Sequence, residues 1–420
     1  MDMRVNRTPI TFPKILFLIV LVVSSPVWSQ TAPAAGASTV NFIQVLGLTF
    51  IRARVNGSRP LSMVLDTGAS YTVLKPEIAA ELGLKPNGEH LQAGGVAQGA
   101  DQTLHLIQGV TLELAGEKLT DQTIATLPVD YIDREAGHPT DGILGGSIFA
   151  SFVVHEDYAA GTVTLIRPGN FKAPEGYTAI PLQVAGTVSL LKLQIQTQGG
   201  DKFEGTFLLD SGMATGNVFL MKAFVDAHPG LKSGKLLLLP PVTAVGGDIH
   251  LAQARLASIG LGPFVLANPD ALFQEQSSPG AGSASLAGIV GTGVLQRFDV
   301  IFDYPHGKLW LKPNAEFGKP FLTNASGLQL QVTPPEFGRV KVRAVIAGSP
   351  AERAGVQAGD TILALNDQKP TASVQPGEAG PALTLSEIRQ RLQVPGNDIY
   401  LRLERNGKPI RVHFITKQLS

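Results

Sequence analysis

Cysteine is absent from this chain of 420 residues, so no disulfide bond can stabilise it. If the chain is exported, it must rely on its hydrophobic core, and it has no N-terminal cysteine to which a lipid could be attached. In an exported protein, the absence of cysteine favours location in a bacterial periplasm. Charged residues are also scarce, at 16%, and cancel to a formal net charge of zero. Because no basic run follows the first residues, we expect no binding of nucleic acid.

Signatures of metals and cofactors are missing as well. The eight histidines are scattered, and no two have the spacing of metal ligands on one helix. No His-Glu-x-x-His motif, phosphate-binding loop or Gly-x-Ser-x-Gly motif occurs. We therefore expect neither a metal nor a cofactor.

Apolar side chains, in contrast, make up 44% of the chain, which also has 46 glycines and 29 prolines. This composition is typical of a well-packed protein with many loops, and it favours a mainly β fold. The length allows two to four domains.

The N-terminus has the pattern of a targeting segment. Three basic residues precede or border an unbroken apolar run, Ile15–Val23, and small residues follow up to Ser29. We expect residues 1–29 to be a signal peptide and residues 30–40 to be a flexible leader. The run is short for a membrane span. An uncleaved anchor is the alternative, and it would be the protein's only membrane contact. In either case the prediction is an exported protein, periplasmic or extracellular.

An acidic residue follows an apolar strand-like segment at Asp66-Thr67-Gly68. The glycine permits a turn and a close approach of the backbone, and the threonine can form local hydrogen bonds. A carboxylate held rigidly in this way suits acid–base work on a bound water. The same three residues are also ordinary turn formers, so the motif has a purely structural interpretation.

The motif recurs at Asp210-Ser211-Gly212, again after apolar residues. Asp66 precedes the segment that begins at Ile143 by 77 residues, and Asp210 precedes the segment that begins at Ile289 by 79. These segments, Ile143-Leu144-Gly145 and Ile289-Val290-Gly291, align at an offset of 146 residues. The same offset brings Phe152 onto Phe298, and it brings Asp157-Tyr158 onto Asp303-Tyr304. A repeat of this kind predicts two tandem β lobes, residues 41–170 and 171–315.

Two lobes with one acid each suggest a paired-carboxylate site. Two carboxylates a hydrogen bond apart cannot both ionise easily, so they share a proton. One can then act as a base on water while the other donates a proton to a carbonyl oxygen.

The two acid motifs and their downstream glycine segments resemble those of aspartic proteases, of both the retropepsin and the pepsin-like kinds. The resemblance covers residues 41 to about 315. It implies that Asp66 and Asp210 hold the attacking water. It also implies that Thr67 and Ser211 brace the two loops and that Gly68 and Gly212 let them approach. Glycine pairs at Gly94-Gly95 and Gly246-Gly247 would be flap candidates, although each is equally interpreted as a surface loop.

The second copy departs from the family pattern. Met213 and Ala214 follow the second motif where Ala69 and Ser70 follow the first, and no flap tyrosine of the pepsin-like kind is evident. A degenerate second lobe is therefore an alternative. In that case two chains would pair their first lobes, or activity would be lost.

After a predicted linker, residues 316–326, the segment 327–420 resembles a PDZ domain. Gly327-Leu328-Gln329-Leu330 stands where such domains have their carboxylate-binding loop, with Gln329 in place of the usual glycine. A Thr-Leu-Ser-Glu capping box predicts a helix from Thr384 to about Leu392. The resemblance implies binding of peptide C-termini by strand addition beside Leu330–Val332. Three apolar residues on one face of the predicted helix would line a pocket or belong to the core: Leu385, Ile388 and Leu392.

The sequence therefore predicts an exported aspartic endopeptidase whose PDZ domain recruits the C-termini of substrates or partners. The alternative is a scaffold with a protease-like body that no longer cuts and that binds peptides through its PDZ domain.

Overall fold

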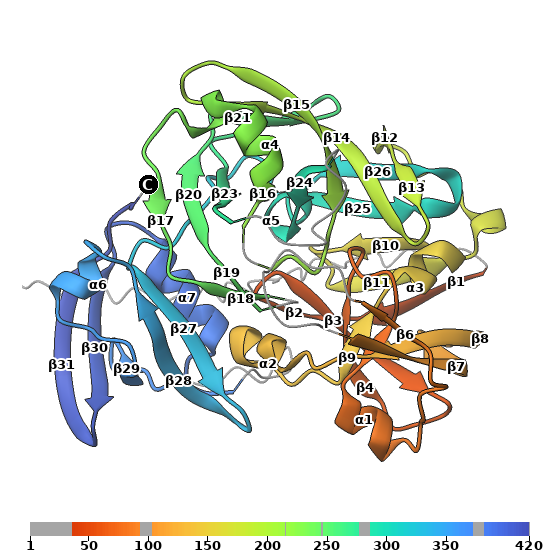
Figure 1. Ribbon diagram of the computed structural model, residues 1–420, viewed down its shortest axis with the longest axis horizontal. Helices are drawn as coiled ribbons and strands as arrows, with labels where there is room; N and C mark the ends of the chain where they lie inside the picture. Colours follow the sequence, from red (N-terminus) through yellow and green to blue (C-terminus); the bar gives the residue numbers. More distant parts are fainter. Residues whose placement is uncertain are drawn as a thin grey trace, which may run out of the picture.

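The computed structural model describes residues 36–92, 103–214, 216–244, 247–276, 286–372 and 382–419. In these parts the protein is mainly β, as predicted, with five sheets and short helices around them (Figure 1). The predicted signal peptide lies outside the described residues, and so does most of the predicted leader. No helix within the described ranges is both long and apolar enough to cross a membrane.

The first large sheet has eight strands in the order β2-β3-β4-β9-β5-β8-β7-β6. Its strands are β2 (Ile43–Val45), β3 (Leu48–Val55), β4 (Leu61–Leu65), β5 (Val73–Leu74), β6 (His90–Gln92), β7 (Thr103–Leu114), β8 (Glu117–Thr126) and β9 (Gly142–Leu144). Three helices accompany it: α1 (Pro76–Glu81), α2 (Asp130–Ala136) and α3 (Gly146–Ser151). Strands β4 and β9 are parallel neighbours, and every residue of β4 is buried. The chain leaves this central strand directly into Asp66.

The second large sheet repeats this arrangement. Its path is β17-β20-β23-β16-β24-β15-β14-β21-β22, with β13 beside β14. The strands are β13 (Gln183–Ala185), β14 (Val188–Gln196), β15 (Lys202–Leu209), β16 (Val218–Leu220), β17 (Leu237–Leu238), β20 (Leu251–Arg255), β21 (Ser258–Leu261), β22 (Phe264–Ala267), β23 (Asp270–Gln274) and β24 (Leu286–Val290). The helices are α4 (Lys222–Ala227) and α5 (Thr292–Leu295). Strands β15 and β24 are parallel neighbours, as β4 and β9 are, and β15 leads into Asp210.

A six-stranded sheet joins the two halves, in the order β1-β11-β10-β25-β26-β12. Its strands are β1 (Ala37–Asn41), β10 (Val153–Asp157), β11 (Thr162–Ile166), β12 (Thr178–Pro181), β25 (Phe298–Asp303) and β26 (Lys308–Pro313). At its centre β10 pairs with β25, the equivalent strand of the other half. One hydrophobic cluster runs through both halves, with Phe149, Phe207 and Phe302 among its fully buried members. The two acid loops therefore rest on a common core.

The C-terminal part forms a separate antiparallel sheet with a core of its own. Its strands are β27 (Leu328–Thr333), β28 (Glu336–Val345), β29 (Thr361–Leu365), β30 (Asp398–Arg405) and β31 (Lys408–Ile415), with helices α6 (Pro350–Arg353) and α7 (Leu385–Gln393). The predicted capping box is confirmed, because the Thr384 side chain accepts from the Glu387 backbone and the Glu387 side chain accepts from the Thr384 backbone. Residues of the predicted linker pack here, since the Ala325 backbone bonds to Leu392 and Lys417.

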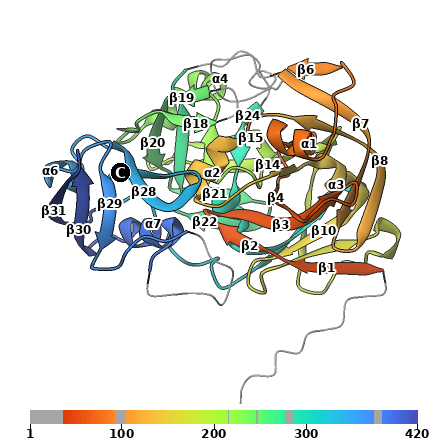
Figure 2. The same cartoon turned by 90° about the horizontal axis from the view of Figure 1, so that it is seen from below.

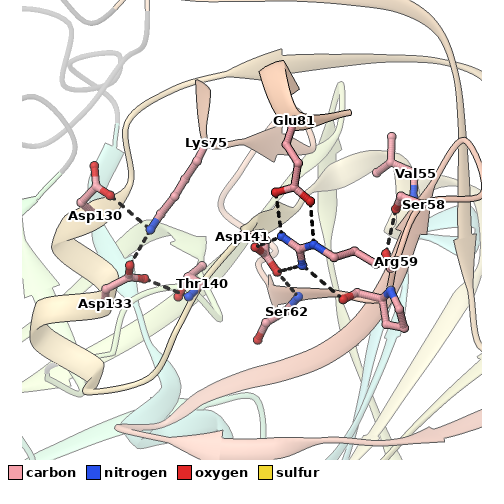
Figure 3. A network of polar contacts seen from close by, with 11 residues as sticks. Val55, Ser58, Arg59, Ser62, Lys75, Glu81, Asp130, Asp133, Thr140 and Asp141 are labelled. Atoms are coloured by element: carbon pink, nitrogen blue, oxygen red, sulfur yellow. Dashed lines mark hydrogen bonds and ion pairs between the residues drawn. The ribbon is translucent and has the colours of Figure 1, made fainter. Parts of the chain in front are cut away.

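Helix α2 lies between the first large sheet and the edge strand β27 of the C-terminal sheet (Figures 1 and 2). Lys75, at the start of α1, holds the N-terminal end of α2 (Figure 3). Its ammonium group lies 2.5 Å from Asp133 and 3.1 Å from Asp130. Asp133 in turn accepts from the backbone of Thr140 at 2.9 Å. Because Lys75 is buried and paired, its ion pairs hold the N-terminal end of α2 against the start of α1.

Candidate active site

The two acid loops are bound to each other by four reciprocal hydrogen bonds. The Thr67 hydroxyl donates to the Leu209 carbonyl at 2.9 Å and accepts from the Ser211 backbone at 2.9 Å. The Ser211 hydroxyl donates to the Leu65 carbonyl at 3.0 Å and accepts from the Thr67 backbone at 3.0 Å. Both hydroxyl residues are buried, so each bond avoids the penalty of an unpaired polar group. The structure thus brings together residues that are 144 positions apart.

The glycines of the two motifs allow the carboxyl groups to approach. A Cβ atom on Gly68 would lie 2.6 Å from the carboxyl carbon of Asp210. A Cβ atom on Gly212 would lie 2.3 Å from Oδ2 of Asp66. Each glycine therefore leaves the space that the carboxyl of the other loop occupies, and a larger residue would displace that carboxyl.

Backbone groups orient both acids in the same way. The Gly68 backbone donates to Oδ1 of Asp66 at 2.7 Å, and the Gly212 backbone donates to Oδ1 of Asp210 at 2.8 Å. The two carboxyl groups lie within hydrogen-bonding reach of each other.

Burial raises the pKa of both carboxyls, and the charge of Asp66 raises the pKa of Asp210 further, well above its ordinary value. Backbone donors counteract this effect and lower the pKa of each group. The site therefore favours one shared proton, held mainly by Asp210, over two carboxylates. Paired carboxyls of this kind are the standard arrangement of an acid and a base in one site.

The Met213 carbonyl keeps its contact with the start of α5, although the backbone bond is longer than its equivalent in the first loop. In the first loop the Ala69 carbonyl accepts from the Gly146 backbone at 2.8 Å. In the second loop the Met213 carbonyl accepts from the Thr292 backbone at 3.4 Å and from the Thr292 hydroxyl at 3.0 Å. The Met213 side chain lies over Gly291, where an added Cβ would come within 2.4 Å of its terminal methyl group. The bulkier residue is thus accommodated by the glycine of the downstream segment.

Two tyrosines beside the acid pair were not predicted as site residues. Tyr131 lies on α2, and Tyr304 follows β25. Burial is the main cause of the raised pKa of each phenol, and the negative charges of Asp66 and Asp210 raise it further. Tyr304 was visible in the repeat as part of Asp303-Tyr304, although nothing marked it as lying near the acids. No sequence pattern marked Tyr131, because only the packing of α2 brings this residue close to the acid pair.

Of the flap candidates, only Gly247 belongs to the described residues, while Gly94, Gly95 and Gly246 lie outside them. Gly247 begins β19 (Gly247–Ile249), which pairs with β18 (Val242–Ala244) as a two-stranded hairpin. Its φ of 120° lies in a region that favours glycine. A role in closing over substrate remains a prediction.

The predicted peptide-binding residues fall into two groups. All five leucine and isoleucine residues belong to the C-terminal core. Leu328, Leu330 and Leu392, together with Gln329, also line one cavity, whereas Leu385 and Ile388 do not. Gly327 has a φ of 88°, and an added Cβ would lie 2.1 Å from that of Ser349, so it is required for the loop itself. The edge predicted to accept a peptide strand, Leu330–Val332, is covered by α2 in this structure, because α2 packs along β27.

Comparison with family models matches residues 51–148 to the model described as aspartyl protease. Residues 51–148 are thus similar to an aspartyl protease domain. This match includes Asp66, Thr67 and Gly68 and ends before the second acid motif. Residues 341–405 match the model described as PDZ domain, a range that includes β29, β30 and the end of β28 but neither β27 nor β31. No curated protein matches the sequence. Among the described residues, no group of three or more His, Asp or Glu side chains is placed to hold a metal ion.

Proposed function

We propose that this protein is an exported aspartic endopeptidase whose two lobes, residues 41–170 and 171–315, each supply one acid to a single site. The observation that carries the proposal is the set of reciprocal hydrogen bonds between the Thr67 and Ser211 loops. These bonds hold Asp66 and Asp210 face to face in a setting that favours one shared proton.

In the proposed reaction, Asp66 takes a proton from the bound water, and the water oxygen attacks the carbonyl carbon of the peptide bond. Asp210 donates its proton to the carbonyl oxygen, which gives a neutral tetrahedral diol. The amide nitrogen then takes the proton from Asp66, and a hydroxyl of the diol returns a proton to Asp210. The carbon–nitrogen bond breaks, and a carboxylic acid and an amine leave. Asp210 is the initial acid because its pKa is raised more strongly.

A site formed within one chain fits the hydrogen bonding better than pairing of first lobes between two chains. The Thr67 hydroxyl and the Ser211 hydroxyl already use each other's loops as partners. Pairing between chains would first break these buried bonds, at a cost of about 1–3 kcal/mol for each polar group left unpaired.

A proteolysis screen across pH, with unfolded protein and peptide libraries as substrates, tests the proposal. We expect cleavage by the mature protein, inhibition by an aspartic-protease inhibitor, and loss of cleavage in Asp66→Asn and in Asp210→Asn. Asp121→Asn is the matched control, because Asp121 is exposed on β8 and has a left-handed backbone that asparagine tolerates.

Each outcome discriminates between the alternatives. Cleavage that survives Asp66→Asn would exclude the mechanism. Full activity of Asp210→Asn would exclude the two-lobe site and favour pairing of first lobes. If the unaltered mature protein cleaves nothing at any pH while peptides still bind to it, the protein is a scaffold that binds peptides through its PDZ domain.

A further inference from the structure

Helix α2 is too short to hold its own position. It has seven residues, whereas an isolated helix in water needs about 12–15 residues to be even marginally stable. Its position therefore depends on what it packs against at each end. Lys75 holds the N-terminal end through Asp130 and Asp133. The C-terminal end is held by the PDZ domain of the same chain.

Arg389, on α7, binds the C-terminal end of α2. Its guanidinium group donates to the Glu135 carbonyl, which lies in the last turn of α2, where carbonyl groups have no intrahelical partner. The same group lies 3.4 Å from the Glu135 carboxylate and donates to the Leu330 carbonyl of β27 at 2.5 Å. Arg343, on β28, lies 3.7 Å from the Glu135 carboxylate. Cations at this end of a helix are favourable, because they face the negative end of the helix dipole.

Apolar packing completes this junction. Gly137, which follows α2, lies between Leu385 on α7 and Val332 on β27. A Cβ added to Gly137 would lie 3.1 Å from Cβ of Leu385 and 3.5 Å from a methyl group of Val332. The edge of β27 thus has a partner from the same chain.

The charges at the junction pair with one another. Arg343 and Arg389 line a cavity of about 240 Å³ together with two acidic residues, Glu135 and Asp270. Asp270 accepts from Asn217 at 2.5 Å, and Glu135 is the carboxylate that pairs with the two arginines. The arginine side chains are only 19% and 16% exposed. Removing one partner would leave a poorly solvated charge behind, so this pairing is costly to break.

The apolar side of α2 packs beside the acid loops. Ile132 belongs to a hydrophobic cluster against which Ala69 and Ala214 also pack. These two alanines come one and two positions after the two acid motifs. Tyr131 packs against the same cluster. Helix α2 therefore connects the arginines of the PDZ domain with the surroundings of the acid pair.

Tyr131 brings a hydroxyl group from α2 to the acid pair. Burial raises the pKa of its phenol, and the charges of Asp66 and Asp210 raise it further, so the phenol stays protonated and can donate a hydrogen bond. A donor stabilises the charge that develops on a reacting oxygen only if its position is fixed beforehand. Tyr131 precedes Glu135 by four residues, which places the two side chains on one face of α2. A shift of Glu135 therefore also moves Tyr131.

We propose that the PDZ domain is a structural part of the catalytic site: its arginines hold Glu135, and α2 transmits this restraint to Tyr131, whose hydroxyl donates a hydrogen bond at the acid pair. Glu135 and Arg389 are then positioning residues, and the edge of β27 serves to brace the site. The effect on catalysis rests on the proposed function, whereas the bracing of α2 does not.

Steady-state kinetics of the full-length mature protein test the positioning role. We expect Arg389→Met to lower kcat about 10-fold or more while KM changes less than about 3-fold, because a displacement of about 1 Å can cost 100-fold in rate. Glu135→Gln keeps the size of the side chain and should act in the same direction. Arg391→Met is the matched control, since Arg391 lies two positions further along α7 and does not share the face of Arg389.

A double-mutant cycle shows whether α2 transmits the restraint. Tyr131→Phe removes only the hydroxyl. We expect it to lower kcat about 10-fold in the wild type but less than about 2-fold in Arg389→Met, where the hydroxyl is already displaced. If Arg389→Met does not fold, Glu135→Gln takes its place in the cycle. Additive losses, or wild-type kcat in Tyr131→Phe, would overturn the proposal.

Hydrogen exchange of the α2 amides, measured by mass spectrometry, needs no substrate and separates the brace from the proteolytic function. We expect residues 130–137 to exchange faster in Arg389→Met than in the wild type and in Arg391→Met. If the wild type cleaves nothing but this difference is found, the proposed function is wrong and the PDZ domain still braces α2. If the wild type cleaves and exchange in α2 is the same in all three proteins, the brace is wrong and the protease stands.

Discussion

Adding one methyl group at Gly212 should separate the acid pair without unfolding the protein. The new Cβ of Gly212→Ala would lie 2.3 Å from Oδ2 and 2.4 Å from Cγ of Asp66, whereas ordinary contacts begin near 3.4 Å. The carboxyl of Asp66 must therefore move by about 1 Å. Gly212 does not have a positive φ, so alanine brings no backbone strain of that kind. A displacement of about 1 Å in a catalytic group can reduce the rate about 100-fold.

The assay compares kcat/KM of the wild type and variants on one peptide at acid pH. We expect Gly212→Ala to lose about 100-fold, mostly in kcat, with thermal unfolding close to that of the wild type. Gly68→Ala should behave in the same way, because its Cβ would lie 2.6 Å from the carboxyl carbon of Asp210. Gly169→Ala is the control, since no atom lies within 4 Å of its added Cβ and its φ is not positive.

Activity within about 3-fold of the wild type in both variants would refute the reasoning. It would mean that the acids do not work in the face-to-face geometry that the two glycines permit. A loss accompanied by a large drop in thermal stability would show unfolding in place of displacement.

Three further predictions follow from buried groups. Thr67→Val should destabilise the protein by about 2–4 kcal/mol in urea unfolding, because the Leu209 carbonyl and the Ser211 amide lose their hydrogen-bond partner. Thr67→Ser keeps the hydroxyl and should destabilise the protein much less. Equal stability of the two variants would contradict the role of the hydroxyl. Burial raises the pKa of Glu156 from 4.5 to about 7. The contribution of Glu156 to the free energy of unfolding is therefore fully present below pH 4.5 and is lost as the pH rises through 7. The loss amounts to about 3 kcal/mol. The change in that free energy between pH 5 and pH 8 should shrink by this amount in Glu156→Gln, and an unchanged pH dependence would contradict the burial of a protonated carboxyl. Because the pKa of Asp210 is raised well above its ordinary value, kcat/KM should stay high at acid pH and fall as Asp210 ionises. An activity that increases above neutral pH would be inconsistent with a shared proton.

The acid loops could be predicted from the sequence because their signals are local. A strand, a turn glycine and a hydroxyl residue occupy neighbouring positions in each acid motif. The internal repeat then identified the second motif as a copy of the first. The capping box at Thr384 is local in the same sense, since its bonds join residues three positions apart. The signal segment and most of the flap candidates, in contrast, stay predictions outside the described residues.

The sequence alone therefore determined a mainly β protein with a duplicated acid motif and a PDZ-like end. Only the tertiary structure decided that the Thr67 and Ser211 hydroxyls bind each other's loops, and that the Met213 carbonyl accepts from the Thr292 hydroxyl. It also decided that Gly137 packs against Leu385, a residue 248 positions away. No periodicity encodes such a contact, because it depends on how separately folded surfaces pack together.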